Sequence, residues 1–301
     1  GGTVTGRISC SNPNLQQIPA RNPEMAARIR GLFLPEEGEQ WASMDFDQQE
    51  PRIMVHFASL THKGLTGADA FVHAYNTDPK TDFHQKVADI AGIPRKQAKT
   101  INLGIMYGMG QTRLAEQLDV TPQEAKRLMR VYHEEVPFVK ELMDAVQRKV
   151  SHRDKGGAVR SLLGRKCRFD LWEPNMFVSA RALPKDEAHI EYGDNIKRAY
   201  TYKALNRLIQ SSAADQTKEA MAKIYEETGK TPLLQIHDEL AFSVASQEEA
   251  RNLCAIMETA VELEVPSPSD ISMGENWGKL TGLGVDDPET SPVMSLTRRL
   301  P

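Results

Sequence analysis

The sequence has few cysteines, few aromatic residues and no long apolar run. Among its 301 residues are three cysteines, and 6% of the residues are aromatic. Cys10, Cys167 and Cys254 are isolated and odd in number, so they predict neither a disulfide framework nor a zinc site and favour a reducing compartment. No apolar run is long enough to cross a membrane and no signal peptide is visible. We therefore expect a cytoplasmic protein without a membrane partner.

An excess of positive charge is also missing. The chain has 37 Lys and Arg against 41 Asp and Glu, a formal net charge of -4. Taken alone, this balance argues against a nucleic-acid-binding protein. Net charge is a poor guide, however, when acids gather at a metal site and bases gather on one face. Basic residues do cluster at 95–99, 155–168 and 197–207, although such runs are usually solvated surface.

Two acidic motifs stand at the ends of predicted strands. In residues 43–52 (SMDFDQQEPR), Asp45 ends a short buried strand, and in residues 235–240 (QIHDEL), Asp238 lies at the turn of a predicted hairpin. Clustered carboxylates are costly unless a cation neutralises them, and their hard oxygen atoms suit Mg²⁺. A lone acidic hairpin tip is more often a solvated turn. Together the two motifs predict a metal site.

Between them, residues 95–108 (RKQAKTINLGIMYG) predict a helix with a functional stripe. Arg95, Lys99, Leu103 and Tyr107 follow one another at intervals of four, so they lie along one side of the helix. The order suits a nucleotide, with phosphates at the cationic end, the sugar at Leu103 and the base near Tyr107. The Arg95 fork grips phosphate oxygens, and Lys99 is a point charge and proton donor. Without the flanking motifs, a basic surface turn followed by core packing is the simpler interpretation.

In this order and at these separations the three motifs resemble those of family-A DNA polymerases, the bacterial DNA polymerase I and phage replicase type. The resemblance extends over about residues 3–277, through TGRIS at 5–9, PNLQQIPARN at 13–22, DFH at 82–84, LNRLIQS at 205–211 and GENW at 274–277. It implies an α+β fold, a right-hand polymerase core with an antiparallel palm sheet, mainly helical fingers and no thumb. The expected palm covers residues 1–58 and 200–277, the fingers 59–199, and a flexible tail 278–301.

The resemblance also implies template-directed DNA synthesis, in which deoxynucleoside monophosphates from dNTPs are added to a primer 3′ end by two-metal phosphoryl transfer. Its cofactor would be two Mg²⁺ ions, with Mn²⁺ as a substitute. The expected metal ligands are Asp45, Asp238 and the backbone carbonyl of Phe46. Lys99 and Glu239 complete the expected catalytic set, Glu239 lying beside the metals.

Substrate contacts follow from the same resemblance. The residues expected at the dNTP are Arg95, Lys99, Leu103, Tyr107, His84, Gln48 and Glu50. The residues expected at primer-template DNA are Arg7, Asn14, Gln16, Arg21, Gly108, Asn206, Gln210 and His237. Glu50 is the expected steric gate against a ribose 2′-hydroxyl. Leu103 departs from the family, which commonly has an aromatic residue there, so incorporation rate and dideoxynucleotide discrimination do not follow from the resemblance.

Two alternatives to a catalytic core remain. Family members have a thumb, and often an exonuclease domain, before the TGRIS segment. We expect that portion to lie on another chain or to have been removed, and a fragment that binds DNA without catalysis, or only with a thumb, is the alternative. A helicase is disfavoured although DEAH occurs at 186–189 and GKT at 229–231. A phosphate loop requires glycine where Ile224 stands, and the two motifs are in the wrong order.

The remaining pattern predicts local structure. Residues 1–40 are expected to form irregular loops and short strands, followed by helices to about residue 150. Thr121 and Glu124 form a capping box that predicts a helix start, and Pro137 should break that helix. Glycines at 156, 157 and 164 predict a hairpin, and a long helix is expected over about 203–227.

Overall fold

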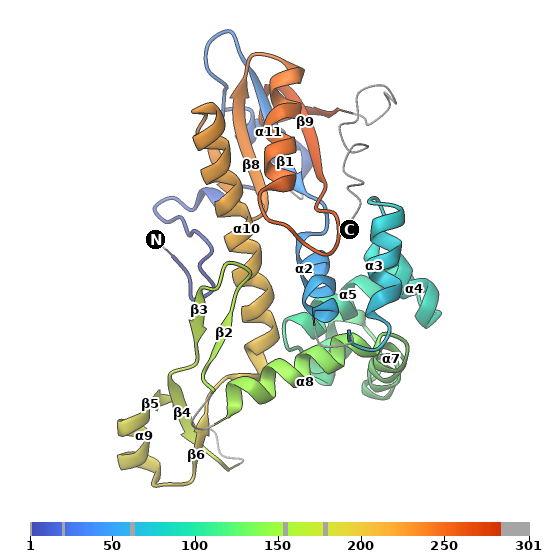
Figure 1. Cartoon of the computed structure of the whole chain (residues 1–301), viewed down its shortest axis with the longest axis vertical. Coiled ribbons are helices and arrows are strands. Elements are labelled where there is room, and N and C mark those ends of the chain that lie inside the picture. Colours follow the sequence, from blue (N-terminus) through green and yellow to red (C-terminus); the bar gives the residue numbers. More distant parts are fainter. Residues whose placement is uncertain (1, 20–21, 61–63, 153–155, 177–179, 284–301) are drawn as a thin grey trace, which may run out of the picture.

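The computed structural model describes residues 2–19, 22–60, 64–152, 156–176 and 180–283. Helices dominate the described chain (Figure 1). They are α1 (Pro23–Arg30), α2 (Gln49–Ser59), α3 (Ala68–Thr77), α4 (Phe83–Ala91), α5 (Arg95–Met106), α6 (Gln111–Leu118), α7 (Pro122–Glu135), α8 (Pro137–Ser151), α9 (Lys185–Tyr192), α10 (Ala204–Thr228) and α11 (Gln247–Thr259), with short 3-10 turns η1 (Leu15–Gln17) and η2 (Thr201–Lys203).

The strands form three antiparallel sheets. The largest has the order β10-β9-β1-β8-β7 and contains β1 (Gln40–Phe46), β7 (Leu234–Ile236), β8 (Glu239–Val244), β9 (Ser269–Asn276) and β10 (Lys279–Gly282). The hairpin expected at 156–168 is confirmed as β2 (Ala158–Arg160) and β3 (Lys166–Arg168). The third sheet has the order β5-β4-β6, with β4 (Leu171–Pro174), β5 (Leu183–Pro184) and β6 (Ile196–Arg198).

One face of the five-stranded sheet packs against helices, and the other carries acidic side chains. Because side chains alternate along a strand, Ala42, Met44 and Phe46 of β1 point to one face, where they pack in a core with α11 and the second half of α10. On the other face, the register pairs Asp45 with Glu239 of β8 and with Asp270 of β9. Directly paired residues share a face, so these three acids form a row across three strands.

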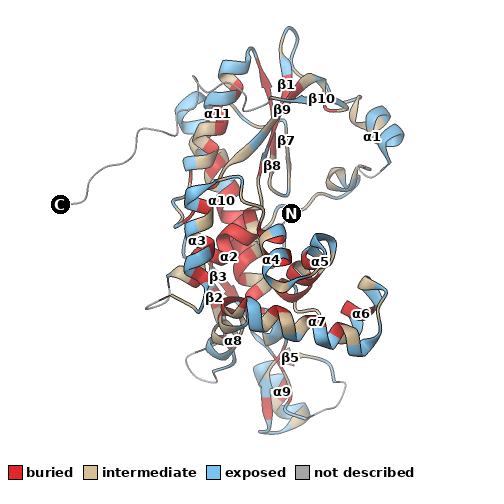
Figure 2. Ribbon diagram, turned by 90° about the vertical axis from the view of Figure 1, so that its right-hand side faces the viewer, coloured by how far each residue is buried: buried red, intermediate tan, exposed pale blue. Residues whose placement is uncertain are grey.

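A second core holds the helical part together. It combines residues of α2 to α8 with Leu205, Ile209 and Ala213 from the first half of α10. Ala220 and Ile224, further along α10, belong to the core of the sheet. The two cores therefore share one uninterrupted helix, which runs through the middle of the molecule and is largely buried there (Figures 1 and 2).

Local signals in the sequence explain several helix ends. The Thr121 side chain accepts from the Glu124 backbone N–H at the start of α7, as its capping box predicts. Helix α7 ends at Glu135 and α8 starts at Pro137, because proline is favoured in a first turn and cannot continue a helix. The expected α+β class and the long helix are confirmed. None of the described helices is long and apolar enough to cross a membrane.

Two expectations for the chain ends were wrong. Residues 1–40 are not all loops and short strands, because Asn22 caps α1, whose proline stands in the first turn. The tail expected from residue 278 starts too early. Lys279–Gly282 forms the edge strand β10, whose backbone pairs with β9, so its glycine-rich composition did not prevent sheet formation. Residues 284–301 lie outside the described residues.

Candidate active site

Asp45 and Asp238 meet at one end of the five-stranded sheet, beside its central strand β1. Asp45 lies near the end of β1, and Asp238 lies in the tight turn between β7 and β8, next to His237 with φ of +58°. The Phe46 backbone N–H donates to the Asp238 carbonyl at 3.5 Å, which ties the turn to the end of β1. The predicted strand and the predicted hairpin are therefore confirmed, and they bring together two carboxylates almost 200 residues apart in sequence.

The carboxylates stand in an environment that opposes their negative charge. Asp45 remains accessible, but surrounding protein displaces much of its water. This burial, followed by the charges of Asp238, Glu239, Asp270 and Asp47, raises the pKa of Asp45 to about 8. Burial also raises the pKa of Asp238. A cation would relieve two neighbouring acids whose charged forms are disfavoured mainly by burial.

The donor set fits a divalent metal ion held jointly with a ligand. Within the described parts of the chain, no group of three or more His, Cys, Asp or Glu side chains is arranged to hold a metal on its own. The Asp45 and Asp238 carboxylates supply oxygen donors of the kind that Mg²⁺ prefers. Magnesium commonly binds through one or two carboxylates and completes its coordination with water and substrate phosphates, so an open pair is sufficient.

Glu239 stands beside the pair, with one of its carboxylate oxygens engaged by neighbouring residues of the sheet. Its Oε1 accepts from the Ser43 hydroxyl at 2.6 Å and from the Trp277 indole N–H at 3.2 Å. Trp277 stacks on Trp41 with ring centroids 6.1 Å apart. These contacts fix Glu239 beside Asp45, where it adds negative charge to the site while its own oxygen is engaged.

Helix α5 presents the predicted stripe to solvent. Arg95, Lys99 and Tyr107 are exposed and Leu103 is half-buried, whereas Ala98, Ile101 and Ile105 on the other side of the helix are buried. Arg95 makes a forked contact with Asp82, with Nε and Nη2 at 2.7 and 2.5 Å from Oδ2. The helical register proposed from the four-residue spacing is therefore observed.

The Asp82 carboxylate both pairs with Arg95 and caps α4. Besides accepting from Arg95, its Oδ1 accepts from the backbone N–H groups of His84 and Gln85 at 2.8 and 3.0 Å, which caps α4. Partial burial acts to raise its pKa, but the hydrogen bonds from Gln85 and Arg95 outweigh burial and lower it. Arg95, the cation expected at the phosphates, is thus paired with Asp82 in the free protein.

His84 is buried behind this pair. Its Nδ1 lies 2.8 Å from the amide nitrogen of Asn102, a fully buried residue of α5. Burial, with the charges of Lys99 and Arg95, lowers the pKa of His84 to about 4 against the opposing effect of Asp82. The ring is therefore neutral at ordinary pH.

Glu50 connects the first motif to the end of α5 and to the N-terminal segment. Its Oε1 accepts from the Arg7 guanidinium, and its Oε2 accepts from the Tyr107 hydroxyl at 3.0 Å. Burial, and then the charge and hydrogen bond of Glu50, raise the pKa of Tyr107 to about 12. Gln210 of α10 also hydrogen-bonds Tyr107. Four residues predicted at the nucleotide or DNA thus meet at one point.

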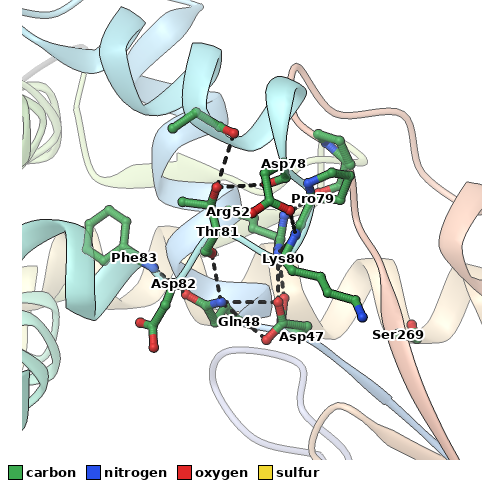
Figure 3. A network of polar contacts seen from close by, with 12 residues as sticks. Asp47, Gln48, Arg52, Asp78, Pro79, Lys80, Thr81, Asp82, Phe83 and Ser269 are labelled. Carbon is green, nitrogen blue, oxygen red and sulfur yellow. Dashed lines mark hydrogen bonds and ion pairs between the residues drawn. The ribbon is translucent and has the colours of Figure 1, made fainter. Parts of the chain in front are cut away.

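Gln48 lies differently from a free triphosphate ligand (Figure 3). Its amide nitrogen donates to the Thr81 carbonyl at 3.1 Å and to Asp47, and its oxygen accepts from the Phe83 N–H at 2.7 Å. Both ends of the amide are occupied, so Gln48 holds the loop before α4 against the first motif. It reaches a phosphate only if these bonds are exchanged.

Arg52 anchors the same loop and was missed by the sequence interpretation. The side chain is fully buried and donates to the Asp47 carboxylate at 2.7 Å and to the carbonyls of Pro79 and Pro266 at 2.6 and 3.0 Å (Figure 3). It also lies over the Tyr75 ring, 4.3 Å from the centroid. The sequence gives one indication of this anchoring role, which is the position of Arg52 at the end of the first motif, in the first turns of α2.

The residues expected at DNA come from the N-terminal segment, α10, the end of α5 and the turn before β8. Arg7 and His237 line a small cavity, together with Ile8, Ala214, Thr217, Lys218 and Gln235. Asn14 caps η1, and the Gln16 amide donates to the Ile8 carbonyl at 3.1 Å. Asn206 and Gln210 are half-buried on α10. Gly108 has a φ of +71°, and any side chain there would bring its Cβ to 3.2 Å from Tyr202. Arg21 lies outside the described residues.

Comparison with known proteins agrees with this arrangement. The family model for DNA polymerase family A matches residues 1–279. The chain is 38% identical over 321 residues to the DNA-directed DNA polymerase of Pseudomonas phage M6, covering 93% of this chain and 44% of that protein. It is 31% identical over 290 residues to thermostable DNA polymerase I of Thermus aquaticus, covering 91% of this chain and 31% of that protein.

A solved structure gives the same result. The POL domain of Pol1 from M. smegmatis, in complex with DNA primer-template and dNTP, matches with a TM-score of 0.72 and 31% identity, over 92% of this chain and 46% of that one. The chain belongs to DNA polymerase family A. Membership implies, in general terms, use of a divalent metal ion. The chain spans less than half the length of these relatives.

Proposed function

We propose that this chain is the catalytic part of a DNA-directed DNA polymerase, which adds deoxynucleoside monophosphates to a primer 3′ end. The observation that carries the proposal is the pair Asp45 and Asp238, juxtaposed at one end of the central strand with raised pKa values, in a member of this family. Primer-template DNA and dNTPs are the proposed substrates.

In the proposed reaction, Asp45 and Asp238 would hold two Mg²⁺ ions, for which Mn²⁺ could substitute, and the Phe46 carbonyl would be a further ligand. Such ions lower the pKa of the primer 3′-hydroxyl and stabilise the leaving pyrophosphate. Arg95 exchanges Asp82 for phosphate oxygens, which its forked geometry matches equally well. Lys99, exposed one helical turn further on, neutralises the triphosphate and supplies a proton to the leaving group.

Glu50 is the proposed sugar gate. The contacts from Arg7 and Tyr107 hold its carboxylate at the junction of the first motif, the N-terminal segment and α5. A side chain fixed from two sides cannot move aside easily, so a ribose 2′-hydroxyl at this place would meet it. Leu103, between Lys99 and Tyr107 on the stripe, is the proposed contact of the deoxyribose.

The test is primer extension with Mg²⁺, dNTPs and a duplex with a 5′ template overhang. Low salt and a high protein concentration are appropriate, because phosphate contacts weaken steeply with salt. We expect extension by the wild type and a loss of about 10³-fold or more in Asp238→Ala, since no neighbour replaces that ligand. Asp270→Asn, which removes a charge from the same acidic row but no proposed ligand, is the matched control. Comparable extension by Asp238→Ala and the control would refute the assignment.

A further inference from the structure

The contact between Asn102 and His84 is placed to determine which histidine nitrogen carries the proton. Helices α4 and α5 pack side by side and bring the two side chains together in the interior, where Asn102 is 0% and His84 6% exposed. The Asn102 Nδ2 and the His84 Nδ1 are 2.8 Å apart. A neutral imidazole has one donor and one acceptor nitrogen, and the partner of one nitrogen fixes the role of the other.

The surroundings of the ring favour its neutral form. Burial is the main cause that lowers the pKa of His84 to about 4, and Lys99 and Arg95 on α5 add to it against the opposing charge of Asp82 at the cap of its own helix. With the Asn102 amide donating to Nδ1, the single proton of the neutral ring is on Nε2. Nδ1 is engaged inside the protein, and Nε2 is the nitrogen left for a ligand.

Stability alone does not explain an asparagine at this position. Its Oδ1 is buried and has no hydrogen-bond partner among the described residues. A buried carbonyl without a partner destabilises a fold, so an apolar side chain of similar size would serve packing better. The amide is explained if its N–H group is required at His84.

We propose that Asn102 is a positioning residue that holds His84 as the neutral Nε2–H tautomer, so that the ring donates a hydrogen bond to the triphosphate of the incoming nucleotide. The opposite tautomer would direct a lone pair at the phosphate oxygens and repel them. This inference rests on the proposed function for its ligand, but the tautomer itself is a property of the free protein.

The first experiment measures that tautomer without substrate. The full chain is labelled with ¹⁵N-histidine, and the side-chain nitrogen shifts of His84, assigned with His84→Gln, are followed from pH 6 to 8. We expect a protonated Nε2 and an unprotonated Nδ1 throughout. A protonated Nδ1 in the wild type would overturn the inference, whatever the polymerase activity. If the expected tautomer is found but the protein does not extend a primer, the result would instead count against the proposed function.

The second experiment reverses the polarity of the contact. Asn102→Asp replaces the donor by an acceptor that draws the proton to Nδ1 and favours the doubly protonated ring. We expect a KM for dNTP about tenfold higher at pH 8, with a smaller change in kcat, and recovery as the pH falls and Nε2 is protonated again. Gln97→Glu, which adds the same charge to α5 at a position without a described contact to His84, is the control.

A double-mutant cycle separates positioning from structural damage. In the His84→Gln background the amide carries its own N–H group for the phosphate, and no tautomer remains to be set. Asn102→Asp should then raise KM less than twofold. An equal effect of Asn102→Asp in both backgrounds, or an effect in the wild type that is independent of pH, would show that Asn102 acts through the fold and would overturn the proposal.

Discussion

Two arginine–aspartate pairs flank the loop before α4, and they differ in almost everything but their chemistry. Arg52 is fully buried, and its donors are divided among Asp47 and two backbone carbonyls. Arg95 has a side chain 48% exposed, and the contact shown for it is the one with Asp82. An arginine–aspartate pair therefore fixes the loop at Arg52 and leaves an exchangeable cation at Arg95. Burial and the number of additional partners determine which of these two roles a pair has.

The largest effect is expected from breaking the buried pair. Arg52→Met removes the donor to the half-buried carbonyls of Pro79 and Pro266 and to the Asp47 carboxylate, which is 30% exposed and keeps its contact with the Gln48 amide. Hydrogen bonds to a charged group contribute about 1.5–3 kcal/mol, so urea unfolding should show a loss of about 2–3 kcal/mol. A loss below about 1 kcal/mol would mean that water replaces Arg52, and the contrast between the two pairs would then disappear.

Breaking the exposed pair should have the reverse result. Arg95→Met is expected to change the free energy of unfolding by about 0–1 kcal/mol, because exposed ion pairs contribute little. It should raise KM for dNTP by about 10- to 100-fold, the loss expected for hydrogen bonds to a charged phosphate. Urea unfolding and steady-state incorporation of one nucleotide measure both quantities. A large loss of stability with an unchanged KM would assign Arg95 to the fold.

Changing the partner of Arg95 should have a smaller effect. Asp82→Asn retains an oxygen that caps α4 but removes the charge that competes with phosphate. KM for dNTP should fall about two- to threefold, corresponding to the loss of an exposed ion pair. A higher KM would indicate that Asp82 orients Arg95 for the substrate rather than competing with it.

The pH dependence of stability offers the finest distinction. The pKa of Asp82 is lowered in the folded state, so its contribution is present above its ordinary value of 3.8 and is lost as the pH falls through the lower folded value. The unfolding free energies of wild type and Asp82→Asn should therefore converge as the pH falls through the folded pKa of Asp82 and differ by a constant amount well above 3.8. A difference that persists at low pH would exclude the ionised carboxylate as its source.

Local patterns in the sequence were enough for the parts of the site that depend on a single element. The strand ending at Asp45, the acidic turn at Asp238 and the stripe from Arg95 to Tyr107 follow from alternation, turn residues and four-residue spacing, and all are observed. These features were predicted correctly because the geometry of each is determined within one strand, turn or helix.

The parts that sequence reasoning missed depend on distant partners. Arg52 meets the carbonyl of Pro266, and Gln48 meets Thr81 and Phe83 instead of being free for a phosphate. The contact between Asn102 and His84 needs two helices to pack in one register. Strand β10 was missed because its pairing energy comes from β9, not from its own residues. No spacing within one segment carries this information.

The shared helix α10 also limits how this molecule can move. Its 25 residues form one unbroken helix, about 37 Å long at 1.5 Å per residue, and each half is packed into a different core. A rotation of α4 and α5 toward the sheet could not bend α10 without opening both cores, so it would have to take place around this helix. Asn206 and Gln210 would keep their position while α5 changed its own, and under the proposed function a base pair at α10 would meet an unchanged surface.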